Sequence, residues 1–133
     1  MTQKQILEFN KRCAEFLGAI YSENAEAWGF GNAKNIGSKK YNGVMYHNII
    51  EAERFEKELK FDSDWSWIME VVEAIEKLDK IEDSVYRVTT FCNICKIDTS
   101  NGEIAWSKSV TKQEAVVEAI NQFLIWYNEH KVN

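Results

Sequence analysis

The sequence predicts an α+β fold in which two long helices cover one face of a three-stranded antiparallel sheet. Apolar residues recur at steps of three and four within residues 63–80 and 111–129, the period of a helix that buries one face. Between them, residues 84–107 alternate and are rich in β-branched and aromatic types, which is typical of strands. An N-terminal helix and a glycine-rich middle loop with a hairpin are expected to precede this part of the chain.

Domain organisation follows from length and composition. A chain of 133 residues with 45% apolar and 13% aromatic residues fits a single domain, 1–133, that buries roughly two thirds of the surface of its unfolded form. We expect an N-terminal helix in 1–21, a variable loop or hairpin with a short helix in 22–60, and an α-β-β-β-α unit in 61–133. The chain contains no proline, repeat or low-complexity run that would mark a linker.

The first helix is predicted in the stretch QILEFNKRCAEFLGAI, and Gly18 is suited to end it. Its apolar stripe is formed by Ile6, Phe9, Cys13, Phe16, Leu17 and Ile20. A stripe of this width needs another element to pack against.

The middle of the chain is predicted to be irregular. Residues 22–47 hold four of the six glycines and show no sustained period, which indicates an exposed and variable segment. Asn42 and Gly43 tolerate a positive φ and are expected to form a hairpin turn between short strands. The next stretch, NIIEAERFEKELK, predicts a short and very polar helix.

The helix expected at 63–80 begins in the stretch FDSDWSWIM. Asp62, Ser63 and Asp64 are each suited to cap it, because their side-chain oxygens accept the free amide protons of a first turn. Trp65 falls on the inner stripe and is expected in the core, whereas Trp67 is expected at the helix flank. The inner stripe comprises Trp65, Ile68, Met69, Val72, Ile75 and Leu78. The neighbours of the two rings are acidic rather than basic, which argues against a base-stacking site.

Two or three antiparallel strands are expected between residues 84 and 107, with the Asn101-Gly102 pair as a hairpin turn. The last helix starts with a capping box, Thr111-Lys112-Gln113-Glu114. In such a box the hydroxyl bonds the amide three residues on, and the carboxylate reaches back. We expect this helix to continue to about Glu129.

Cys92 and Cys95 have the spacing of a metal or redox motif. A structural zinc site needs four ligands, usually from two such pairs, and the other candidates, Cys13, His47 and His130, are scattered. Neither histidine accompanies a nucleophile motif, and there is no glycine-rich phosphate loop. We therefore expect structural cysteines, no metal, no cofactor and no enzymatic activity.

The compartment is expected to be the cytoplasm. No apolar run approaches the ~20 residues of a membrane helix, so no membrane contact is expected. The N-terminal stretch, MTQKQILEFNK, lacks the order of a secretory signal. Three cysteines cannot all pair with one another, and nothing else indicates an oxidising compartment.

Charge and aromatic content single out one segment as a contact surface. The net charge of −5 argues against general affinity for nucleic acid, but residues 27–47 contain no acid. Rings supply contact area and lysines steer association, so we expect a partner to bind this segment. The expected partner-binding residues are Trp28, Phe30, Lys34, Lys39, Lys40, Tyr41 and Tyr46. The alternative is that the rings pack under their own loop and the lysines are only solvated.

Three stretches, NKRCAEFLG, LKFDSDWSWIMEVVEAIEKL and TKQEAVVEAINQFLIWYN, resemble a family of small uncharacterised proteins of phage and prophage genomes. The chain departs from that family in its middle segment and at Glu70, where the family has a proline. No functional residue transfers from the resemblance. It implies a protein that binds and disables a host factor in the host cytoplasm, such as a CRISPR or other defence nuclease or ribonucleoprotein.

The order α-β-β-β-α is also similar to that of the double-stranded-RNA-binding domain, and TKQEAVVEAI is similar to the start of its final helix. This likeness implies RNA binding as the alternative function, with Lys108 and Lys112 as contacts. Val116 and Val117 stand where that domain carries further positive charge. A homodimer is a further alternative, since the last helix has a wide apolar stripe. The stripe is widened by Leu124, Ile125 and Trp126.

Overall fold

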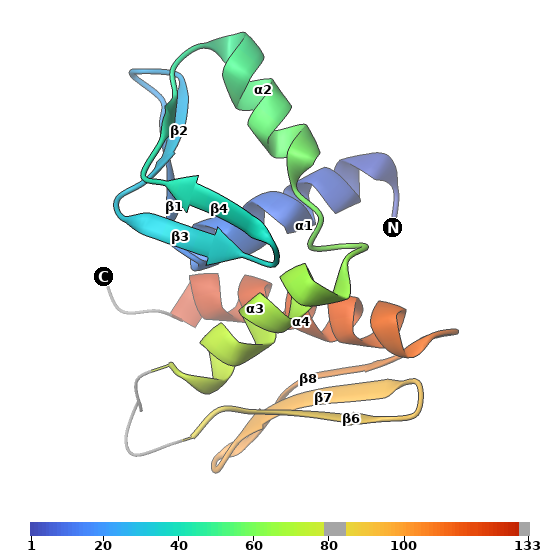
Figure 1. Cartoon of the computed structure of the whole chain (residues 1–133). Coiled ribbons are helices and arrows are strands. Elements are labelled where there is room, and N and C mark those ends of the chain that lie inside the picture. Colours follow the sequence, from blue (N-terminus) through green and yellow to red (C-terminus); the bar gives the residue numbers. More distant parts are fainter. Residues whose placement is uncertain (79–84, 131–133) are drawn as a thin grey trace. The chain divides into compact units, whose positions relative to one another are not determined.

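A computed structural model describes residues 1–78 and 85–130 of the chain (Figure 1). By their contacts, the residues group into two compact units, Met1–Trp67 and Ile68–Asn133. The first unit contains α1 (Gln3–Phe16), β1 (Ala19–Ser22), β2 (Ala27–Phe30), β3 (Ala33–Ile36), β4 (Lys39–Asn42), β5 (Met45–Tyr46), α2 (Ile49–Glu58) and the start of α3 (Trp65–Glu76). The second contains the rest of α3, β6 (Arg87–Phe91), β7 (Ile94–Thr99), β8 (Gly102–Lys108) and α4 (Lys112–His130). The predicted α+β class is confirmed.

A capping box formed by Thr2 and Gln5 starts α1. Thr2 Oγ1 accepts the Gln5 N–H at 3.1 Å, and Gln5 Oε1 accepts the Thr2 N–H at 2.8 Å. The helix ends just before Gly18, whose φ of 110° suits glycine, so the predicted end is confirmed. The prediction for Ile20 is wrong. Ile20 lies in β1 and is 65% exposed, because the two-residue alternation of a strand replaces the helical period there.

The segment from 22 to 47 is not an irregular loop, which corrects the prediction. Its strands form two small antiparallel sheets: β2 and β5 join β1 in the order β1-β2-β5, and β3 pairs with β4. In the first sheet, Trp28 of β2 pairs with Tyr21 of β1 on one side and with Tyr46 of β5 on the other. The Tyr21 ring packs on Trp28, and the Trp28 and Tyr46 rings pack on α2. Phe55 of α2 is fully buried, and its ring centroid lies 4.6 Å from Tyr46 and 5.6 Å from Trp28. An aromatic cluster therefore forms the core of this unit.

The predicted hairpin turn at Asn42-Gly43 is also wrong. β4 ends at Asn42, and Gly43, with φ of 72°, redirects the chain so that β5 pairs with β2 rather than with β4. The tight turn lies earlier, at Gly37-Ser38, because Ile36 pairs directly with Lys39. Gly37 has φ of 60°. A positive φ suits glycine in such a turn, because glycine has no Cβ to clash.

α2 confirms the short polar helix that the sequence predicts. Asn48 caps it through Oδ1, which accepts the Glu51 N–H at 2.9 Å. Ala52, Phe55 and Leu59 are buried. The rest of the helix is mostly exposed, in keeping with its polar sequence.

α3 begins at Trp65, and Asp64 is the cap. Its Oδ1 accepts the Ser66 N–H at 2.9 Å and the Ser66 hydroxyl at 2.6 Å, and these bonds to Ser66 lower the pKa of Asp64. Asp62 has another role, accepting a hydrogen bond from Asn10. The helix ends at Glu76, before the expected end at Lys80, and Asp79 and Lys80 lie outside the described residues.

The predicted burial of the two tryptophans in α3 is reversed. Trp67 is 5% exposed, whereas Trp65 and Met69 are each 41% exposed. The buried stripe contains Trp67, Ile68, Val71, Val72 and Ile75. At about 100° per residue, this stripe is rotated by roughly 45° from the predicted one. Within the first unit, Phe61 packs edge-on against Trp67 at 5.0 Å, which explains why this ring is the buried one.

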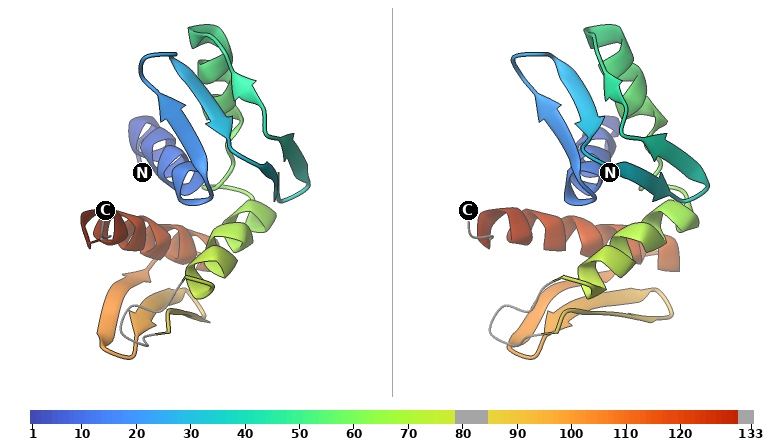
Figure 2. Two further views of the ribbon diagram at one scale, coloured as in Figure 1. Left: turned by 90° about the vertical axis from the view of Figure 1, so that its left-hand side faces the viewer. Right: turned by 60° about the vertical axis from the view of Figure 1, so that its left-hand side comes forward.

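The second unit has the predicted three-stranded antiparallel sheet, in the order β6-β7-β8. α4 packs across β7 and β8, and the described part of α3 in this unit lies on the same side of the sheet (Figures 1 and 2). The sheet side chains buried on this side include Cys95, Ile97, Ala105 and Ser107. The arrangement of two helices on one face is confirmed.

The hairpin turn and the last helix of this unit lie within one residue of the positions that the sequence predicts. The β7-β8 hairpin turns at Ser100-Asn101, since Thr99 pairs with Gly102, one residue before the predicted pair. Thr111 Oγ1 accepts the Glu114 N–H at 3.1 Å, as the capping-box pattern predicts. α4 then continues to His130, one residue beyond the expected end. No helix in the described part of the chain has both the length and the apolar character needed to cross a membrane.

Candidate functional site

Three of the four predicted contact rings are buried, and the fourth, Tyr46, is half-buried with its ring centroid 4.6 Å from that of Phe55. Trp28, Phe30 and Tyr41 are 2%, 4% and 2% exposed, and each lies against Phe55. The Trp28 Nε1–H is also used, donating to Glu56 at 2.9 Å. The expectation that these three rings contact a partner is therefore wrong. The alternative, in which the rings pack under their own segment, describes them.

The lysines of this segment do not form one patch. In the β3-β4 hairpin, Lys34 pairs with Tyr41 and Asn35 pairs with Lys40. Because side chains alternate along a strand, Lys34 and Lys39 share a face with Tyr41, and Lys40 points to the opposite face. Lys39 Nζ lies 5.8 Å from the centre of the Tyr41 ring.

A pocket of about 400 Å³ lies beside Tyr41, within the first unit. Its lining residues are Ser38, Lys39, Tyr41, Glu58, Lys60, Asp64 and Trp67. The Tyr41 hydroxyl is buried without a hydrogen-bond partner in the described part of the chain. Burial, followed by the nearby Tyr46 and Glu58, raises the pKa of Tyr41, so the phenol stays neutral at physiological pH.

A second candidate surface is the side of the β6-β7-β8 sheet that faces away from α4, which we call the open face. Strand register arranges its side chains in three cross-strand rows. The rows are Phe91–Ile94–Lys108, Thr89–Lys96–Trp106 and Arg87–Asp98–Glu103. Phe91 is 71% exposed and Trp106 is 47% exposed. Exposed large aromatic side chains gathered on one face are a mark of a binding surface.

Charges on the open face leave two lysines beside the rings. Arg87 Nε lies 3.4 Å from Asp98 Oδ1, so these two charges are paired, and Glu103 leaves one negative charge in the same row. Lys96 and Lys108 are exposed and make no ion pair within residues 1–78 and 85–130. The rows containing Phe91 and Trp106 thus have positive charge and no acid.

The structure separates the two lysines proposed for RNA binding. Lys108 lies on the open face, next to Ile94 across the strands. Lys112 is the first residue of α4, the helix that covers the other face. Of the two, only Lys108 therefore belongs to the open face, and RNA binding through both lysines stays a prediction.

Phe91, Lys96 and Trp106 are the site residues that the sequence prediction missed. Their signal lies in the alternation of β7, where the apolar Cys95 and Ile97 alternate with Lys96 and Asp98. Assigning the apolar set to the helix-covered face would have placed Phe91 and Trp106 on the open face.

The cysteines show no joint site in the described residues. Cys92 is exposed in the β6-β7 turn, and Cys95 is buried on the helix-covered face. Burial raises the pKa of Cys95 to about 11, so its thiol is protonated at neutral pH. In the same part of the chain, no three histidine, cysteine or acidic residues gather in a way that could hold a metal ion.

Comparison with known proteins yields no relative from which a function could be transferred. No protein-family model matches the chain, and no curated protein or solved structure is significantly similar to it. The surfaces described above are therefore the basis for a functional inference.

Proposed function

We propose that this chain is a non-enzymatic binding protein that engages a host protein or ribonucleoprotein through the open face of the β6-β7-β8 sheet. The observation that carries the proposal is the exposure of Phe91 and Trp106 on one sheet face, beside Lys96 and Lys108. Aromatic side chains contribute large contact area and lose little rotamer entropy on binding, so they often dominate interface energy.

The resemblance to phage proteins motivates the role assigned to this binding. A small chain that covers part of a host nuclease or ribonucleoprotein can block its substrate, so no chemistry of its own is required. In this proposal the protein acts as an anti-defence or anti-CRISPR inhibitor in the host cytoplasm and needs no cofactor. One of the two histidines is engaged within its own helix: the His130 ring stacks on Trp126 at 4.7 Å, and its Nδ1 lies 2.8 Å from the Trp126 carbonyl oxygen.

Affinity capture from host lysate tests the proposal. The parent chain is compared with a Phe91→Ala/Trp106→Ala double variant, each with and without nuclease treatment. An Ile50→Ala variant is the control, because Ile50 is also 71% exposed but belongs to α2. We expect one host protein or ribonucleoprotein to be retained by the parent and the control and lost from the double variant. Equal retention by the double variant would show that the open face is not the contact.

Single-stranded RNA is the second candidate for the open face, because lysines lie in the same rows as the rings. Base stacking on aromatic side chains with neutralisation of phosphates is the general mode of single-strand binding. Phe91 and Trp106 lie on the two outer strands, about 10 Å apart across the sheet, and in neighbouring rows, about 7 Å apart along it, so their backbone positions are roughly 12 Å apart. Two rings at this separation could stack bases of one strand.

Fluorescence anisotropy with an oligouridine probe decides this candidate. If RNA binds, affinity should fall as salt is raised, and a Lys96→Gln/Lys108→Gln variant should show a shallower salt dependence. Absence of binding at low salt would eliminate RNA as the ligand. Loss of every captured partner after nuclease treatment would favour RNA over a protein.

A further inference from the structure

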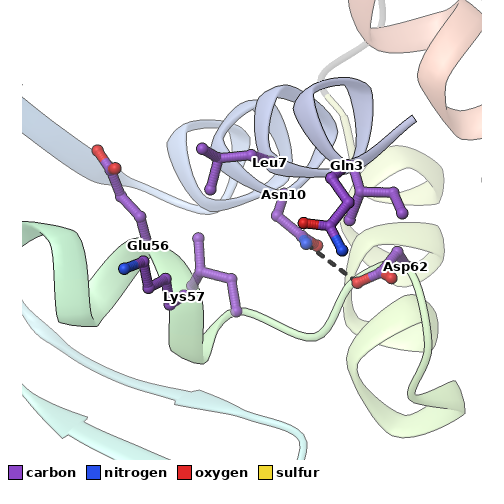
Figure 3. A pocket seen from close by; sticks show the side chains of 8 residues that line it. Gln3, Leu7, Asn10, Glu56, Lys57 and Asp62 are labelled. Atoms are coloured by element: carbon purple, nitrogen blue, oxygen red, sulfur yellow. Dashed lines mark hydrogen bonds between the residues drawn. The ribbon is translucent and has the colours of Figure 1, made fainter. Parts of the chain in front are cut away.

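A second pocket of the first unit lies between α1 and α2 and has a volume of about 420 Å³ (Figure 3). It is lined by Gln3, Ile6, Leu7, Asn10, Glu56, Lys57, Leu59 and Asp62. Three of these side chains, Ile6, Leu7 and Leu59, are apolar. The others are polar or charged, so the pocket combines an apolar wall with hydrogen-bonding groups.

Asn10 is the unusual residue of this pocket. It is only 3% exposed, and its Nδ2 donates a hydrogen bond to Asp62 Oδ1 at 3.0 Å (Figure 3). A carboxylate only accepts, so this bond fixes which way the amide points. The Asn10 Oδ1 atom is then buried and has no donor within the described residues. A buried acceptor without a donor is unfavourable, and Asn10 lines the pocket, so a small displacement of its side chain on binding would let a ligand supply the donor.

The lining carries one cation, Lys57, and two carboxylates, Glu56 and Asp62, and the acceptors that stay available indicate which kind of donor would fit. Glu56 Oε1 is already occupied, at 2.9 Å from Trp28 Nε1 and 3.4 Å from Lys11 Nζ. Within residues 1–78 and 85–130, Asp62 accepts one hydrogen bond, from Asn10, so its carboxylate retains capacity for a further donor. Asn10 Oδ1 and the Asp62 carboxylate are thus two acceptors on side chains that are hydrogen-bonded to each other. A planar cation with two parallel N–H donors matches such a pair better than a single ammonium does.

We propose that this pocket binds a monoalkylguanidinium group. Asn10 Oδ1 and the Asp62 carboxylate accept its N–H donors, and Ile6, Leu7 and Leu59 flank its alkyl chain. Such a group occurs in small alkylguanidines and in the arginine side chain of a protein partner. The pocket belongs to the first unit and the open face to the second. The experiments on the pocket therefore test this proposal separately from the proposed function.

Isothermal titration calorimetry with n-butylguanidine and n-butylamine tests the ligand class, because the two probes differ only in the head group. We expect butylguanidine to bind the parent at least tenfold more tightly than butylamine. Replacing Asp62→Asn should weaken butylguanidine by tenfold or more. Glu53→Gln, the same charge change on an exposed α2 residue outside the pocket, should leave its affinity unchanged. N-acetylarginine methylamide separates the two sources: binding as tight as that of butylguanidine indicates a protein side chain, and weaker binding indicates a small molecule.

Three results would overturn the proposal: no heat with butylguanidine at millimolar concentration, equal affinity for the Asp62→Asn variant, or no preference over butylamine. If Asp62→Asn does not fold, the side-chain amide signals of Asn10 in the NMR spectrum of the parent provide the test. These signals should shift on addition of butylguanidine, and signals that stay in place would show that the pocket holds only solvent.

Discussion

Trp65 and Trp67 are separated by one residue but differ in burial, and this difference makes a residue-scale prediction. Trp67 is 5% exposed and packs on Phe61, whereas Trp65 is 41% exposed. Replacing Trp67 by alanine should lower the free energy of unfolding by about 3–5 kcal/mol, as the loss of a buried aromatic does. Trp65→Ala should cost at least ~2 kcal/mol less, because less apolar surface is lost. Urea titrations of both variants measure the difference, and equal costs would contradict the burial described here.

Tyr41 makes the second residue-scale prediction, which concerns pH. Burial raises its pKa in the folded state, whereas the phenol of the unfolded chain titrates at about 10. As the pH rises above about 10, the unfolded chain loses this proton while the folded chain keeps it, so the free energy of unfolding falls. Tyr41→Phe should therefore lose less stability between pH 9 and 11, roughly, than the parent does.

At neutral pH the same variant should be as stable as the parent or more stable, by up to ~3 kcal/mol, because it removes a buried hydroxyl that has no partner in the described residues. Unfolding in urea at neutral and alkaline pH provides both measurements. Lower stability of Tyr41→Phe at neutral pH would show that the hydroxyl is hydrogen-bonded in solution.

At the scale of elements, the β3-β4 turn depends on Gly37 for two reasons. Its φ is 60°, and a Cβ there would lie 2.7 Å from both Ser66 Oγ and Trp67 Cδ1. Gly43 is a matched control, since its φ is 72° and the nearest atom to an added Cβ is 3.7 Å away. Both alanine variants should lose about 1–2 kcal/mol to the left-handed backbone. Gly37→Ala should lose about 1–3 kcal/mol more, because its side chain overpacks the turn. Equal melting temperatures would show that the turn does not rest on Trp67.

The length of an element decided whether the sequence could predict it. α4 has 19 residues and β6, β7 and β8 have five to seven, so their periods repeat often enough to be recognised. The strands β1 to β5 have only two to four residues each, which is too short for alternation to stand out. Their pairing also depends on contacts with Phe55, which lies far along the chain. The burial of the aromatic residues at 28–41 could not be predicted for the same reason, because their neighbours in the sequence do not indicate that the distant helix α2 covers them.

At the scale of the whole molecule, the expected single domain predicts how the chain unfolds. The two compact units contain 67 and 66 residues, and a domain of that size alone buries only about 60% of the surface of its unfolded chain. α3 begins in the first unit and continues into the second. We therefore expect one cooperative unfolding transition. NMR signals of Phe55 and Ile97, one from each core, should disappear at the same urea concentration. Two separate midpoints would instead indicate two independent domains.

Two pairs of lysines distinguish the effect of net charge on partner binding from the effect of where the charge lies. Lys39 and Lys40 lie in the first unit, and Lys96 and Lys108 lie on the open face of the second. Replacing either pair by glutamine changes the net charge of −5 by the same amount, so a general charge effect would weaken partner binding equally. If the open face is the contact, the Lys96→Gln/Lys108→Gln variant should bind the captured partner several-fold to about tenfold more weakly and with less dependence on salt. The Lys39→Gln/Lys40→Gln variant should bind like the parent. A larger loss in that second variant would move the contact to the β3-β4 hairpin, where the sequence first placed it.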